Sequence, residues 1–425
     1  MSAARLAGAV LAGSLVLTGC GGGEETGASS GSGTVKFDQF CTIDGLAPSP
    51  RHSTIVIDTA AIRAASPEQF RTSNPELFKL VMGVANPTVA LESGASAARE
   101  RVTILAASSR GGTLTPVFSG CIPGVSAAEL AARSRSGSDS AADRYFGSDL
   151  PAQVTKHQEA FTRQLLLVLA KLGDSAEPTA AAADGQAPLV RLLRPLGSSQ
   201  PTGGTVQRLF IFSDLAPTLE GVPLDVTEAR KKGFADAGRA ALRLGLADAY
   251  LIGTRGALQD AEQQYLDAFM LGSQARLGHA GGYSTNSLAP PPSSVVTYRG
   301  SLVLDATSFP LELRVATTSG GDLVNSWVTY TSSHGQRSTP IAGRFDCAAP
   351  ADCTLQSDRA GGLGQLWGTR PGPEPELLPE GPLGGLRFLD ARETAGGLKG
   401  RVHDPAIGLG RPGGGLTIEA RRVKT

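Results

Sequence analysis

Two aspartates follow expected strands at positions where α/β sheets commonly bind ligands. Asp58 ends the β-branched run Ser53–Asp58, and Asp214 directly follows a second buried-type run, Arg208–Ser213. In sheets of parallel strands, ligands collect outside the carboxyl ends of the strands. Carboxylates at such an edge can serve catalysis, but they can also cap helix N-termini or bind loop backbone. We expect the capping role for both and assign no catalytic residue.

The first twenty residues carry a different chemistry, that of a thiol placed for acylation. Arg5 precedes the apolar stretch Leu6–Leu17, whose 12 residues are too few to span a bilayer and are typical of a secretory signal. The stretch runs into Leu17-Thr18-Gly19-Cys20, which resembles the lipobox of bacterial lipoproteins. That resemblance implies that residues 1–19 are a signal peptide and that Cys20 becomes the acylated first residue of the mature chain, anchored in the membrane.

A flexible tether is expected after the anchor. Residues 21–33 are rich in Gly and Ser and have no large apolar side chain, so we assign 20–36 to the tether. Gly21 stands where an Asp would imply retention in the inner membrane. The resemblance therefore implies the outer membrane, on its periplasmic side or at the cell surface.

The remaining cysteines are even in number, as expected for disulfides in an exported chain. The chain has five cysteines, so Cys41, Cys121, Cys347 and Cys353 are left once Cys20 is set aside. Four cysteines allow three pairings; the short Pro-containing loop between Cys347 and Cys353 favours a local bridge, which leaves Cys41–Cys121. A CxxC pair is absent, so we expect no zinc site and no other cofactor.

Residues 37–282 alternate between strand and helix patterns. We expect strands at Ser53–Asp58, Arg101–Ala107, Leu114–Phe118, Arg208–Ser213 and Ala247–Gly253, and helices at Thr155–Leu172, Asp225–Leu246 and Leu258–Leu277. The turn Arg110-Gly111-Gly112 predicts an antiparallel hairpin of the second and third strands. The long segment between the first two strands suits a parallel crossover. The pattern predicts a doubly wound, mostly parallel α/β sheet with one antiparallel hairpin.

The pattern changes after a Pro-rich linker, which we place at 283–294. Residues 295–425 hold short alternating runs and Gly-rich turns without long helical periodicity. We expect an all-β domain there, a sandwich or small barrel. Its strands are expected at Val295–Leu304, Leu311–Thr317, Asp322–Thr331, Gly385–Asp390 and Gly415–Arg422. Trp327 and Trp367 are expected to pack in its core or rim.

The order of strands in the first domain resembles that of von Willebrand factor A-like domains. The resemblance rests on the run ending at Asp58, the hairpin that follows, and the run ending at Asp214. Members often hold a divalent ion through an Asp-x-Ser-x-Ser motif, whose positions here are Asp58, Ala60 and Ile62. Both hydroxyls are missing, so the resemblance implies a degenerate metal site with Asp58 and Asp214 as its remaining candidate ligands.

A second resemblance uses other acids. The segments around Asp58 and Asp248 are similar to the first and last motifs of PIN-type ribonucleases, which cluster acids around Mg²⁺. The chain carries 39 Lys+Arg and 39 Asp+Glu, however, and nucleic-acid binding needs an excess of cations. We therefore expect no nucleic-acid partner.

These observations favour a non-enzymatic protein over an enzyme. We expect a lipid-anchored protein of the cell envelope that works by binding another envelope protein or a surface ligand. The alternative is a metal-dependent hydrolase or nuclease using acids at the sheet edge, either Asp58 with Asp214 or Asp58 with Asp248.

Overall fold

A computed structural model gives the fold of most of the chain. It describes residues 34–41, 48–107, 114–125, 129, 150–174, 187–196, 205–253, 257–304, 307–332, 335–349, 352–357, 388–395, 397–403 and 416–423. Cys20, the proposed signal peptide and Trp367 lie outside these residues. Within the described part, no helix has the length and apolarity needed to cross a membrane.

The first domain is built on the predicted mostly parallel sheet, which has seven strands rather than the five expected. The strands lie in the order β1-β4-β3-β2-β5-β6-β7. Their bounds are β1 Val35–Phe37, β2 Arg51–Asp58, β3 Arg101–Ala107, β4 Leu114–Cys121, β5 Val206–Phe212, β6 Ala247–Ile252 and β7 Ala275–Gly281. Strands β3 and β4 form the predicted antiparallel pair, and every other neighbouring pair is parallel.

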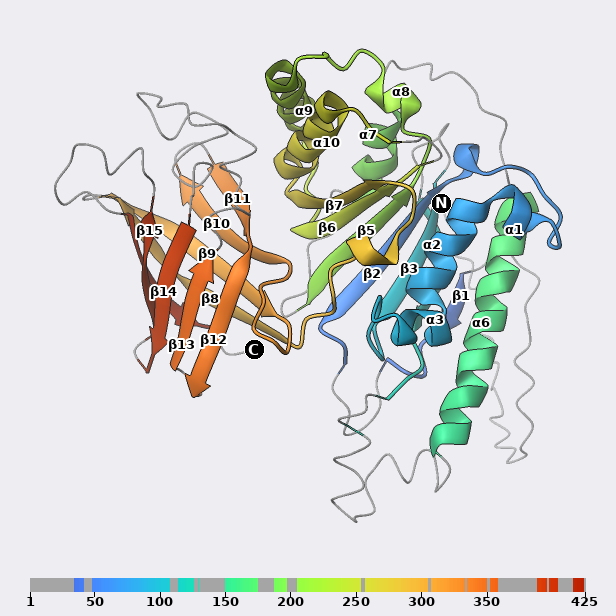
Figure 1. Cartoon of the computed structure of the whole chain (residues 1–425), viewed down its shortest axis with the longest axis horizontal. Coiled ribbons are helices and arrows are strands. Elements are labelled where there is room, and N and C mark those ends of the chain that lie inside the picture. Colours follow the sequence, from blue (N-terminus) through green and yellow to red (C-terminus); the bar gives the residue numbers. More distant parts are fainter. Residues whose placement is uncertain are drawn as a thin grey trace, which may run out of the picture. The chain divides into compact units, whose positions relative to one another are not determined.

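Helices cover both faces of this sheet (Figure 1). One core contains residues from α1 (Phe70–Ser73), α2 (Pro75–Ala85) and α6 (Leu150–Asp174), beside the short α3 (Pro87–Glu92). The other contains residues from α7 (Pro188–Leu193), α8 (Ala216–Leu219), α9 (Val226–Ala240) and α10 (Asp260–Gly272). Short 3-10 turns lie at η1 (Thr59–Ala61), η2 (Arg194–Leu196) and η3 (Thr285–Ser287). The sheet with its two helical layers is the doubly wound arrangement that the alternating pattern predicts.

Local signals explain where several helices start and stop. Asp225 caps α9 by accepting a hydrogen bond from the Glu228 backbone N–H at 2.9 Å. Helix α9 ends at Ala240 rather than at the expected Leu246, because Ala241 adopts a left-handed conformation with φ of 53°. Helix α10 ends at Gly272, so the expected helix 258–277 is in fact a helix followed by strand β7.

Two strands of this first sheet were not predicted from the sequence. Strand β1 begins at Val35, inside the segment 20–36 that we assigned to the tether, and it pairs in parallel with β4. Strand β7 has no β-branched residue, and its sequence continues the helical pattern of α10. Both are edge strands of the sheet, where pairing with one neighbour and packing against it outweigh intrinsic propensity.

The second domain is a nine-stranded antiparallel sheet that curls towards a barrel. Its strand order is β11-β10-β9-β8-β16-β15-β14-β13-β12. The bounds are β8 Ser294–Leu304, β9 Thr307–Thr317, β10 Ser326–Ser332, β11 Gly335–Ile341, β12 Gly343–Ala349, β13 Asp352–Ser357, β14 Phe388–Thr394, β15 Gly397–His403 and β16 Leu416–Arg422. The edge strand β12 returns to the β9–β10 connection, where the Leu323 N–H donates to the Gly343 carbonyl at 2.8 Å. The all-β prediction is confirmed, and Trp327 is fully buried.

Candidate functional site

Asp58 lies at the carboxyl end of β2 with both carboxylate oxygens bound by the protein itself. Its side chain is 4% exposed. Oδ1 accepts a hydrogen bond from the Ala60 backbone N–H, and Oδ2 accepts one from the Ser213 hydroxyl, each at 3.0 Å. Asp58 is also the N-cap of the short 3-10 turn Thr59–Ala61. The carboxylate therefore joins the loops that follow two neighbouring parallel strands, β2 and β5.

The neighbouring polar groups at this edge are occupied in the same way. Asp214 Oδ1 accepts from the Ala216 N–H at 3.0 Å, just before α8. The Thr59 hydroxyl donates to the Ala107 carbonyl at the end of β3, at 2.9 Å. Asp58 thus caps a 3-10 turn, whereas Asp214 binds the backbone at the start of α8 without being its N-cap residue.

The electrostatics of the edge are set by burial. Burial raises the pKa of Asp58, and the hydrogen bonds from Ala60 and Ser213 and the positive charge of Arg191 offset only part of that rise. Asp214 adds a smaller contribution in the raising direction. Arg191 lies on α7, the helix that packs against α8 over this end of the sheet. The positive charge of Arg191 thus favours the ionised form of Asp58.

This donor set does not fit the divalent ion that the von Willebrand factor A resemblance implies. Octahedral oxygen coordination needs several free oxygens converging on one point. Here the motif positions that would supply hydroxyls are Ala60 and Ile62, and Asp58 already accepts from two protein donors. Among the residues that the structure describes, no three His, Cys, Asp or Glu side chains are grouped closely enough to hold a metal ion.

The structure separates Asp248 from the other two acids, which corrects the alternative that placed it at the same edge. Asp248 stands near the start of β6 and is paired in register with Arg208, five residues before the level of Ser213. At about 3.3 Å per residue, this puts it roughly 16 Å from the edge that carries Asp58. Its carboxylate forms an ion pair with Arg276 at 2.9 Å. Asp58 and Asp248 therefore cannot share one metal ion.

Sequence reasoning missed a buried ion cluster at the amino ends of the strands. Glu100 is completely buried, and its two oxygens bind Arg51 at 2.8 Å and Arg208 at 2.9 Å, both of which are also buried. Burial alone would raise the pKa of Glu100, but the charges of Arg208 and Arg51 outweigh it and hold the pKa below its usual value. Arg208 within an otherwise apolar strand was the sequence signal for this cluster, because a central cation needs a buried partner.

Both predicted disulfides are present. Cys41 is bonded to Cys121 at the end of β4, across 80 residues of sequence. Cys347 is bonded to Cys353, which stands directly opposite it on the neighbouring strands β12 and β13. The second bridge was expected in a loop, and it instead crosses a β-hairpin. Two disulfides indicate an oxidising compartment outside the cytoplasm.

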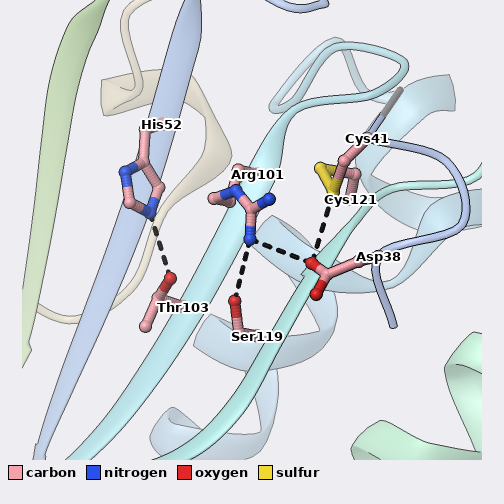
Figure 2. Close-up of a disulfide and its surroundings, with 7 residues drawn as sticks. All are labelled: Asp38, Cys41, His52, Arg101, Thr103, Ser119 and Cys121. Atoms are coloured by element: carbon pink, nitrogen blue, oxygen red, sulfur yellow. Dashed lines mark hydrogen bonds and ion pairs between the residues drawn. A yellow bond between two sulfur atoms is a disulfide. The ribbon is translucent and has the colours of Figure 1, made fainter. Parts of the chain in front are cut away.

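Figure 2 shows the polar surroundings of the Cys41–Cys121 bridge. Arg101 donates to Asp38 at 3.0 Å and to the Ser119 hydroxyl at 3.1 Å, so it links the segment before Cys41 to β4. Cys41 Sγ lies 3.5 Å from Asp38 Oδ1. The bridge and the ion pair together attach the N-terminal segment to the sheet.

Comparison with known proteins adds a distant similarity and no family. No protein-family model matches the chain, and no curated protein sequence matches it. Among solved structures, the chain is similar to a von Willebrand factor type A protein from Catenulispora acidiphila, with 12% sequence identity and a TM-score of 0.25. The match covers 74% of this chain and spans 64% of the length of that one.

Proposed function

We propose that this chain is a lipid-anchored protein of the cell envelope that binds another protein without catalysing a reaction. The anchor is Cys20, acylated after removal of residues 1–19, and the location is the outer membrane. The two disulfides support this location, because such bonds persist outside the cytoplasm.

The proposal that the chain is not an enzyme rests on the hydrogen bonds that its two candidate aspartates already accept. A general acid or base must reach the substrate, and a metal ligand must offer free oxygens to the ion. Asp58 is buried and accepts from Ala60 and Ser213, while Asp214 accepts from Ala216. These contacts support a structural role for the acids.

The partner surface that we propose is the loop between α8 and α9, together with the start of α9. It presents Leu224, whose side chain is 85% exposed, next to Val226, which is 37% exposed. Both precede or begin the helix that Asp225 caps, so a hydrogen-bonded helix start holds them in place. Apolar side chains on such a fixed loop gain free energy when a partner removes them from water.

Photo-crosslinking tests this surface. A photoreactive amino acid replaces Leu224 in the full chain, expressed in its own cells, and a second chain carries it at Leu167 on α6, which is 49% exposed. We expect a discrete crosslinked protein from position 224 and none from position 167. Equal yields from both positions, or no adduct from position 224, would contradict the proposed surface.

A further inference from the structure

The segment Thr34–Cys41 joins the sheet as an edge strand with few attachments of its own. Strand β1 pairs with β4 at three positions, from Val35 opposite Phe118 to Phe37 opposite Gly120. The ion pair of Arg101 with Asp38 is exposed to solvent, with 40% and 50% of the two side chains accessible. Exposed pairs of this kind contribute little to stability. The hydrogen bonds of Thr34 with the Pro116 carbonyl at 2.8 Å and of Gln39 with the His157 ring at 3.2 Å are also exposed to solvent. Hydrogen bonds and charges alone therefore hold this segment weakly.

Apolar contacts add to the attachment through two side chains, Phe37 and Phe40. Phe40 is 1% exposed and packs with Cys121 and Val154. Phe37 meets Phe161 of α6 edge to face, with ring centroids 5.1 Å apart. Gly120 leaves room for Phe37, because a Cβ on it would lie 2.8 Å from the Phe37 Cβ. The sheet thus has a site that fits this segment. The conformational entropy lost on ordering its eight residues opposes the free energy gained from these contacts.

We propose that the Cys41–Cys121 disulfide makes this segment a redox-controlled clasp. While the bond is intact, Cys41 cannot leave β4, so the segment stays in place whatever the balance of its weaker contacts. Once the bond is reduced, Thr34–Cys41 detaches while the rest of the sheet remains folded. Detachment uncovers the outer backbone edge of β4 and the site of Phe40.

The different exposure of the two cysteines determines which sulfur atom a reductant attacks first. Cys121 is 3% exposed, whereas Cys41 is only half-buried, so an incoming thiolate reaches the Cys41 sulfur first. A dithiol protein or reagent attacks Cys41 Sγ and forms a mixed disulfide, and Cys121 leaves as a thiolate that takes a proton from water. The second thiol of the reductant then closes its own disulfide and releases Cys41. Two electrons pass from the dithiol to the bridge.

Detachment also changes the reach of the anchor, a consequence that rests on the proposed function. If Cys20 is held in a membrane, the described residues Thr34–Cys41 become part of the tether when the clasp opens. Eight fully extended residues can lengthen the tether between the membrane and the sheet by at most about 26 Å. The clasp itself does not depend on acylation, so an unacylated C20A chain should open in the same way.

Hydrogen exchange of the full chain measures the clasp. The folded, oxidised protein is compared with the same protein reduced by dithiothreitol and with the double variant C41S/C121S. We expect exchange in 35–41 to become at least tenfold faster in both, together with the outward-facing amides of β4, while β5 and β6 keep their protection. Trypsin should cut after the exposed Lys36 only when the clasp is open.

The double variant C347S/C353S is the matched control, because dithiothreitol reduces both bridges. It should leave the exchange of 35–41 at the rate of the oxidised protein. Unchanged exchange of 35–41 after reduction of Cys41 and Cys121 has been verified by alkylation would overturn the proposal. So would equal loss of protection in β1 and β5, which would make the bond a global stabiliser.

Discussion

Asp58 carries its charge in a place from which water is largely removed. Burial raises its pKa above the ordinary value of 3.8, so the folded chain binds this proton more tightly than the unfolded chain does. The contribution of Asp58 to stability is therefore most favourable at low pH. It declines as the pH rises through the folded pKa and then levels off.

The variant D58N tests this reasoning. The Asn carbonyl can still accept from the Ala60 N–H, and its amide can donate to the Ser213 hydroxyl, so the loops stay joined without a buried charge. We expect D58N to be more stable than the natural chain at pH 7, by up to about 1 kcal/mol, and to lose that advantage near pH 3. Urea unfolding at the two pH values measures the difference. A metal-site role would instead give a natural chain that Mg²⁺ stabilises and a variant that it does not.

Glu100 is the residue on which the buried cation pair depends. Replacing it by Gln leaves Arg51 and Arg208 as buried charges without a counter-charge, which costs about 3–5 kcal/mol of unfolding free energy. The matched control is E228Q on α9, since Glu228 and its partner Lys231 are 59% and 57% exposed. The control should change stability by less than about 0.5 kcal/mol. Similar losses of unfolding free energy in the two variants would show that Glu100 does not stabilise the buried arginines.

At the scale of elements, the packing of α9 on α10 depends on one of two glycines in the same helix. A Cβ on Gly233 would lie 2.2 Å from the Tyr265 carbonyl oxygen, whereas one on Gly238 would meet nothing within 4 Å. We expect G233A to destabilise the protein by about 1–3 kcal/mol. G238A should stabilise it by up to about 1 kcal/mol, because Ala favours the helix. Thermal unfolding measures both changes. We expect G233A to lower the unfolding temperature and G238A to raise it, and a shift in the same direction would contradict the packing argument.

Elements with a strong local pattern were predictable from sequence, and elements set by their neighbours were not. The apolar runs before Asp58 and Asp214 identified β2 and β5. The even number of cysteines and the short spacing of two of them identified both disulfides. The three residues of β1 carry no pattern of their own, and their strand forms because β4 offers an open edge. Arg208 signalled that a buried partner was needed, but its partner Glu100 was not predictable, because the two come together only through the register of β2, β3 and β5.

At the scale of the whole molecule, the described residues form a folded body with two disulfides, and the anchor that we propose at Cys20 would attach this body to a membrane. The carboxylate oxygens of Asp58 at the sheet edge accept hydrogen bonds from the protein itself, and the side chain of Leu224 nearby is exposed to solvent. The chain has equal numbers of cationic and anionic residues, so it lacks the excess of cations that nucleic-acid binding generally uses. These features are the basis on which we propose contact with a protein at the cell envelope.

The mass of the mature N-terminal peptide tests this account most directly. The protein is extracted from its own cells with detergent, digested, and the N-terminal peptide is measured by mass spectrometry. We predict a peptide that begins at Cys20 and carries acyl chains, and a C20A variant that is not acylated and leaves the membrane fraction. A native chain that retains residues 1–19 without acylation and stays in the cytosol would contradict the account.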